Sequence, residues 1–108
     1  MEKNLYSMKG KVCLITGGST GLGSYIAHGF LAAGASRVYI TARSKDNLVK
    51  KKNELEKIFN GECIAIKSDL SGLDGVHKLV SEIRAREQHI DVLVNNAGIG
   101  LGTPIKTM

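Results

Sequence analysis

The chain has 108 residues, a formal net charge of +5 and a hydrophobic content of 43%, which together suit one small globular domain. Its apolar runs fall well short of the ~18 residues that a membrane-spanning helix needs, so we expect no membrane insertion. The basic residues are scattered, and the aromatics are only three Tyr and two Phe, which argues against a nucleic-acid-binding protein.

The lysine cluster at residues 50–52 and the N-terminal residues each predict a property of the protein. The densest basic cluster, Lys50-Lys51-Lys52, lies among apolar residues at helical spacing, which is typical of a solvated helix face. The first eleven residues are polar and contain no apolar stretch of signal-peptide length, so we expect a cytoplasmic protein.

The first predicted elements are a strand and a helix on either side of a glycine-rich turn. A nearly continuous apolar run at Val12–Thr16 predicts a strand of a parallel sheet that is covered on both faces. The helix is expected to begin at about Thr20 and to end at Gly34, placed there as a left-handed cap. Its inner face is expected to carry Leu22, Ile26, Phe30 and Leu31.

Three further strands alternate with two further helices. Strands are expected at Arg37–Ala42, Glu62–Lys67 and residues 90–94. One helix is expected over residues 44–60, closed by Gly61, and another after Ser71, which with Asp74 resembles a capping box. In the helix after Ser71, Val76, Leu79, Val80 and Ile83 are expected to mark one face. The alternation predicts a doubly wound parallel α/β sheet of Rossmann type, with right-handed crossovers and a ligand at the carboxyl ends of the strands.

Residues 16–23 read Thr-Gly-Gly-Ser-Thr-Gly-Leu-Gly and predict a phosphate-binding turn. Backbone N–H groups at a helix N-terminus bind an anionic pyrophosphate, and glycines allow the ligand to approach. A P-loop would need Lys and then Ser or Thr after Gly23, but Ser24 and Tyr25 follow it, so ATP or GTP hydrolysis is not expected. The N–H groups expected to face the pyrophosphate are those of Ser19, Leu22 and Gly23, with the hydroxyls of Ser19 and Thr20 nearby.

The glycines Gly17, Gly21 and Gly23 do not follow the G-x-G-x-x-G order. Their T-G-x-x-x-G-x-G order, with Asn95-Asn96-Ala97-Gly98 downstream, resembles the short-chain dehydrogenase/reductase family. The resemblance runs from about Gly10 and covers only the cofactor-binding front half of a family member. We therefore interpret residues 1–108 as a partial Rossmann domain, a fragment with the first four strands and three helices. The resemblance also implies that Asn96, Ala97 and Gly98 lie beside the cofactor.

The end of the second predicted strand indicates which dinucleotide binds. An acidic residue there would bind the ribose 2′-hydroxyl of NAD, whereas this chain has Ala42 followed by Arg43. A guanidinium holds a 2′-phosphate in bidentate fashion, so we predict NADP(H) as the cofactor. After the third strand, the resemblance implies that the Asp69 carboxylate accepts from the exocyclic amine of adenine and that the Leu70 N–H donates to the ring.

No catalytic residue is assigned. The family's chemistry uses a Ser and a Tyr-x-x-x-Lys motif, but none of the three tyrosines here is followed by Lys at the fourth position. The histidines His28, His77 and His89 occur singly, so no metal site is expected. The cysteines Cys13 and Cys63 fall in the first and third strands, which a sheet like that of the family separates by the second, and are expected to be packed thiols.

Two functions remain open. In the first, the chain is the N-terminal part of an NADP(H)-dependent oxidoreductase that interconverts a carbonyl and an alcohol, inactive alone and homo-oligomeric at full length. Residues 5–11 and 98–100 look similar to the family branch that includes 3-oxoacyl-carrier-protein reductases of the rhamnolipid-biosynthesis type. In the second, the chain is a non-catalytic module for dinucleotide binding or assembly.

Overall fold

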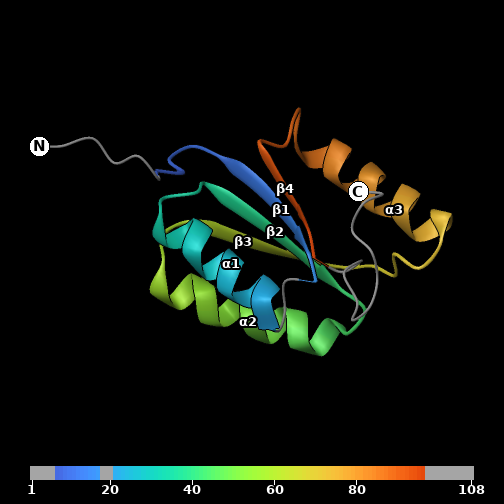
Figure 1. The fold of residues 1–108 in the computed structure, drawn as a ribbon, viewed down its shortest axis with the longest axis horizontal. Coiled ribbons are helices and arrows are strands. Elements are labelled where there is room, and N and C mark those ends of the chain that lie inside the picture. Colours follow the sequence, from blue (N-terminus) through green and yellow to red (C-terminus); the bar gives the residue numbers. More distant parts are fainter. Residues whose placement is uncertain (1–6, 18–20, 97–108) are drawn as a thin grey trace, which may run out of the picture.

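The computed structural model describes residues 7–17 and 21–96, which form a four-stranded parallel sheet with three helices (Figure 1). The strands are β1 (Val12–Thr16), β2 (Arg37–Ala42), β3 (Glu62–Lys67) and β4 (Val92–Asn95). The helices are α1 (Gly21–Ala32), α2 (Lys45–Ile58) and α3 (Leu73–Arg86). The strand order is β3-β2-β1-β4, so the prediction of a Rossmann-type parallel sheet is confirmed.

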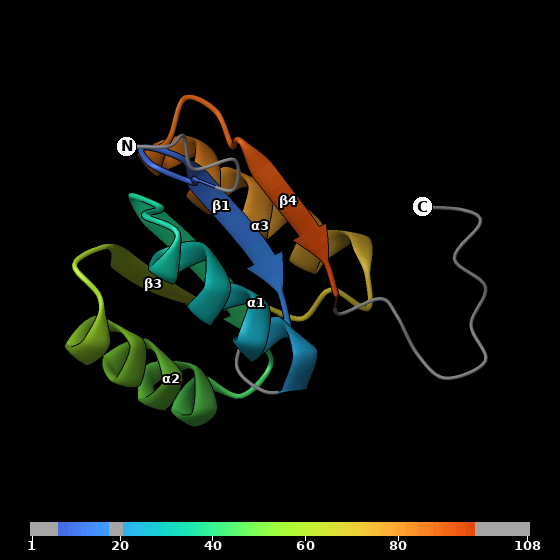
Figure 2. The same cartoon turned by 60° about the vertical axis from the view of Figure 1, so that its left-hand side comes forward.

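The helices cover both faces of the sheet. Helices α1 and α2 lie on one face and α3 lies on the other (Figure 2). Successive side chains of β1 alternate between two apolar clusters, because side chains of a strand point to opposite faces in turn. Cys13 and Ile15 pack with Ala27, Leu31 and Leu48 under α1 and α2. On the opposite face, one cluster contains Val12, Leu14, Tyr39, Ile66, Leu79 and Ile83.

The two cysteines are packed thiols, as predicted. Val38 of β2 is the register partner of both Cys13 and Cys63, so one strand separates the two sulfur atoms. Both side chains are fully buried and free. Burial in apolar surroundings raises the pKa of Cys13 to about 11 and that of Cys63 to about 12, so both thiols stay protonated and inert at neutral pH.

Helix α1 is rotated by about one residue from the predicted orientation. Its buried residues are Gly23, Ala27 and Leu31, whereas Leu22 is 63% exposed, so the prediction that Leu22 faces the core is wrong. Ile26 and Phe30 are partly buried at the edge of the apolar cluster. The rotation follows from the closeness of the helix to the sheet, because residues with small or absent side chains must lie at the tightest contact.

The predicted glycine cap of α1 is confirmed, and the one proposed for α2 is wrong. Gly34 has a φ of +100°, and the N–H groups of Gly34 and Ala35 donate to the carbonyls of Leu31 and Phe30, as in a Schellman motif. Helix α2 begins after Ser44, as expected, and ends at Ile58. Gly61 does not have a positive φ; it is close-packed, because a Cβ there would lie 2.4 Å from the Ala35 carbonyl oxygen.

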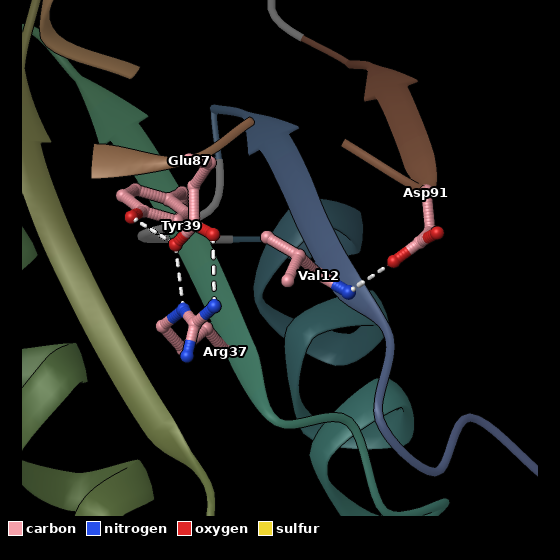
Figure 3. Close-up of polar contacts among 5 residues, drawn as sticks. All are labelled: Val12, Arg37, Tyr39, Glu87 and Asp91. Carbon is pink, nitrogen blue, oxygen red and sulfur yellow. Dashed lines mark hydrogen bonds and ion pairs between the residues drawn. The ribbon is translucent and has the colours of Figure 1, made fainter. Parts of the chain in front are cut away.

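A partly buried ionic cluster joins the C-terminal end of α3 to β2 (Figure 3). Glu87, whose side chain is 6% exposed, accepts hydrogen bonds from Arg37 at 2.5 and 2.8 Å and from the Tyr39 hydroxyl at 2.6 Å. Arg37 and then Tyr39 hold the pKa of Glu87 below its usual range. Burial and the bond to Glu87 raise the pKa of Tyr39 to about 12.

Strand β4 begins two residues later than predicted. Asp91 precedes it, and the Val12 N–H donates to Asp91 Oδ2 at 2.8 Å (Figure 3). The Asp91 N–H donates in turn to the Val12 carbonyl at 2.8 Å. Ile90 is partly buried against the cluster under α3. These long-range contacts set where β4 starts. None of the described helices is long and apolar enough to span a bilayer.

Candidate functional site

A cleft of about 870 Å³ extends from the carboxyl ends of the strands along the side of the sheet that α3 covers, as far as Ile90 before β4. It is bordered by residues at the ends of β1, β2 and β3, and α3 lines another side with Val76, Leu79, Val80 and Ile83. Of the apolar face predicted for this helix, Leu79 and Ile83 are buried, whereas Val76 and Val80 are 37% and 42% exposed. One end of the cleft, with Gly17, Arg43 and Asp69, therefore lies at the position where parallel α/β sheets bind ligands.

The turn after β1 brings the first turn of α1 against the sheet. Gly17 and Gly21 have φ of +73° and +58°, and the Gly17 N–H donates to the Thr41 carbonyl at 2.7 Å. A Cβ on Gly23 would lie 2.2 Å from the Gly17 carbonyl oxygen, so only glycine permits this approach. The N–H groups in the first turn of a helix have no intrahelical partner and can bind an anion. Ser19 and Thr20 lie outside the described residues.

Asn96 ties the end of β4 to this turn. Its Nδ2 donates to the Gly17 carbonyl at 3.2 Å, and its backbone N–H donates to Thr16 Oγ1 at 2.9 Å. Thr16 Oγ1 also lies 3.2 Å from Asn95 Oδ1. This role of Thr16 was not predicted from the sequence; the available signal was a hydroxyl residue at the end of an apolar strand. Ala97 and Gly98 lie outside the described residues.

Arg43 and Asp69 follow neighbouring strands and border the same cleft. The Ser68 N–H donates to the Ala42 carbonyl at 2.9 Å. The pairing of β2 with β3 therefore continues to the residues directly before Arg43 and Asp69. Arg43 is exposed and makes no ion pair within the described parts of the chain. Its guanidinium is therefore available to an anionic ligand.

The Asp69 carboxylate is fixed by its neighbour Ser71. Asp69 Oδ1 accepts from the Ser71 hydroxyl at 2.7 Å and from the Ser71 N–H at 3.0 Å. These two bonds, followed by the charge of Arg43, lower the pKa of Asp69. Leu70 is partly buried against the apolar cluster under α3.

The predicted capping box at Ser71 is wrong. Helix α3 has Gly72 at its N-cap, without a side-chain capping bond. Ser71 lies one residue too early to cap the helix, and its hydroxyl donates to Asp69 instead. Sequence reasoning also missed Ser68, whose Oγ is buried and has no hydrogen-bond partner among the described residues.

Curated relatives match nearly all of this chain. The 3-oxoacyl-[acyl-carrier-protein] reductase of rhamnolipid biosynthesis from Pseudomonas aeruginosa is 38% identical over 102 residues, or 94% of this chain and 39% of the relative. Human dehydrogenase/reductase SDR family member 1 is 39% identical over 101 residues, or 93% of this chain and 32% of the relative. The chain thus spans between about a third and two fifths of these relatives.

Solved structures share the fold. The NADP active-site complex of RhlG from Pseudomonas aeruginosa superposes with a TM-score of 0.80 at 38% identity, covering 89% of this chain and 38% of that one. L-Sorbose reductase from Gluconobacter frateurii, solved with NADPH and L-sorbose, gives a TM-score of 0.81 at 34% identity and covers 94% and 38%. The family model described as short chain dehydrogenase matches residues 11–108. On these matches, together with the parallel sheet and its glycine turn, the chain belongs to the short-chain dehydrogenase family.

Proposed function

We propose that the protein is an NADP(H)-dependent oxidoreductase that interconverts a carbonyl and an alcohol by hydride transfer, and that these residues bind its cofactor. The observation that carries this proposal is the placement of Arg43 on the same cleft as the glycine turn after β1. The cleft thus offers helix N–H groups for a pyrophosphate and an exposed guanidinium for a second phosphate.

Each part of the dinucleotide has a group of suitable chemistry. The pyrophosphate is assigned to the turn formed by Gly17, Ser19, Thr20, Gly21, Leu22 and Gly23. Arg43 binds the 2′-phosphate of the adenosine ribose. Asp69 accepts from the exocyclic amine of adenine, and the Leu70 N–H donates to the ring. Asn96, Ala97 and Gly98 border the riboses.

Two similar structures support this choice of cofactor, because one is an NADP complex and the other holds NADPH and L-sorbose. The hydride transfer itself is proposed for the whole protein. Residues 1–108 contain no Tyr-x-x-x-Lys motif, so these residues alone are expected to form only part of the domain and to bind cofactor without turnover. We further propose that the whole protein is a cytoplasmic homo-oligomer.

Titration calorimetry of the full-length protein with NADPH and NADH tests the cofactor proposal. NADPH is expected to bind more tightly, and Arg43→Ala is expected to weaken NADPH roughly ten- to a hundredfold, because a hydrogen bond to a charged group is lost. NADH affinity is expected to change little. Lys50→Ala, which removes one exposed charge from α2, is the control for net charge. Equal affinity of the wild type for both dinucleotides would refute the role of Arg43.

A further inference from the structure

The first turn of α3 packs directly against the peptide that joins Asp69 to Leu70. A β-carbon built on Gly75 would lie 1.6 Å from the Asp69 carbonyl oxygen and 2.7 Å from its carbonyl carbon. Both distances are far inside van der Waals contact, and the obstacle is backbone. Gly75 does not have a positive φ, so the close approach, not the backbone conformation, is the reason that glycine is required here.

Ser71 fixes the side chain of the same residue. Its hydroxyl and its N–H both donate to Asp69 Oδ1, and the other carboxylate oxygen, Oδ2, has no hydrogen-bond partner in the described parts of the chain. The carboxylate is therefore held through one oxygen while the other remains able to accept from a ligand. Asp69 borders the cleft beside Arg43.

We propose that Gly75 and Ser71 are positioning residues that let the cleft distinguish adenine from other purines. The inference rests on the proposed function, in which Asp69 accepts from the exocyclic amine. Gly75 sets where the Asp69 backbone lies, and Ser71 sets how its carboxylate is turned. A base with a carbonyl in place of the amine would present an acceptor to a fixed carboxylate, leaving both groups without a donor.

The test compares NADPH with its hypoxanthine analogue, in which oxygen replaces the 6-amino group, by titration calorimetry of the full-length protein. The wild type is expected to prefer NADPH by roughly tenfold, the value of about one hydrogen bond. Gly75→Ala is expected to bring this ratio close to one, because the added methyl group displaces the Asp69 carbonyl. Ser71→Ala is expected to reduce the ratio in part, because the Ser71 N–H still donates.

Gly72→Ala is the matched control, since a Cβ at this neighbouring glycine meets nothing within 4 Å; it should keep the wild-type ratio. A ratio of affinities is insensitive to a loss of folded protein, which lowers the number of binding sites for both ligands alike. The preference for NADPH over NADH should survive in every variant, because Arg43 is untouched.

The outcomes separate this inference from the proposed function. If Gly75→Ala and Ser71→Ala both keep the wild-type ratio, the inference is wrong. If the wild type binds both bases equally, the inference is also wrong, while a preference for NADPH over NADH would still support the proposed function. If NADPH does not bind at all, the proposed function fails as well. Should Gly75→Ala not fold, the ratio for Ser71→Ala decides, because that variant only removes an atom.

Discussion

Replacing Gly23 by alanine is expected to reduce NADPH affinity at least about a hundredfold, because two or more hydrogen bonds to a charged pyrophosphate, each worth about 1.5–3 kcal/mol, are lost. The added methyl group would lie 2.2 Å from the Gly17 carbonyl oxygen and 2.9 Å from Asn96 Nδ2. Either α1 moves away from the turn or the turn moves away from β4. In both cases the N–H groups at the start of α1 lose the position in which they meet a pyrophosphate.

The same substitution is expected to cost about 1–3 kcal/mol of unfolding free energy, because the site is already close-packed. Gly29→Ala is the matched control: it lies in the same helix, has no positive φ, and its Cβ would meet nothing within 4 Å. This control is expected to stabilise the protein by about 0.4–1 kcal/mol. Calorimetry and urea unfolding measure both quantities, and unchanged NADPH affinity in Gly23→Ala would show that the turn does not hold the cofactor.

Replacing Glu87 by alanine is expected to cost about 2–3 kcal/mol of unfolding free energy. It removes three hydrogen bonds to a carboxylate and leaves the Tyr39 hydroxyl buried without a partner (Figure 3). The cost stays below the 3–5 kcal/mol of a broken, fully buried pair, because the Arg37 side chain is 39% exposed. Urea unfolding measures the loss. Glu82→Ala, on the exposed part of α3, should change stability little, and an equal loss in both variants would contradict the role of Glu87.

The pH dependence of stability follows from the same cluster. Because Arg37 and Tyr39 lower the pKa of Glu87 in the folded state, its contribution is present above the unfolded pKa of 4.5 and is lost as the pH falls through the folded value. The pKa of Tyr39 is raised from 10 to about 12, so its contribution is present below pH 10 and is lost as the pH rises toward 12. Urea unfolding across pH should show both losses. Glu87→Gln should reduce the acid loss without abolishing it, because the pKa values of Asp69 and Asp91 are also lowered in the folded state. An unchanged acid limb would contradict this assignment.

Local sequence pattern was sufficient for most elements. The bounds of β1, β2 and β3 agree with the prediction, because each is an apolar run bounded by turn or charged residues. The cap at Gly34 was also predictable, since few residues other than glycine adopt a positive φ. The start of β4 and the rotation of α1 were not, because both depend on contacts between residues far apart in the chain.

In the candidate site too, some features could be predicted from the local sequence and others depend on contacts between distant residues. Sequence position alone predicts that Arg43 and Asp69 share an edge of the sheet, because both follow parallel strands. The roles of Ser71 and Gly75 could not be predicted, since a hydroxyl three residues before an acidic residue is equally typical of a helix cap. The bonds from Glu87 to Arg37 and Tyr39 join residues 50 and 48 positions apart, and no local pattern reports them.

A crystal structure of the full-length protein with NADP⁺ tests the central claim most directly. We expect the pyrophosphate to accept from N–H groups of the turn between Gly17 and Gly23, and the Arg43 guanidinium to lie within hydrogen-bonding distance of the 2′-phosphate. A dinucleotide bound elsewhere, or a 2′-phosphate bound without Arg43, would contradict the account.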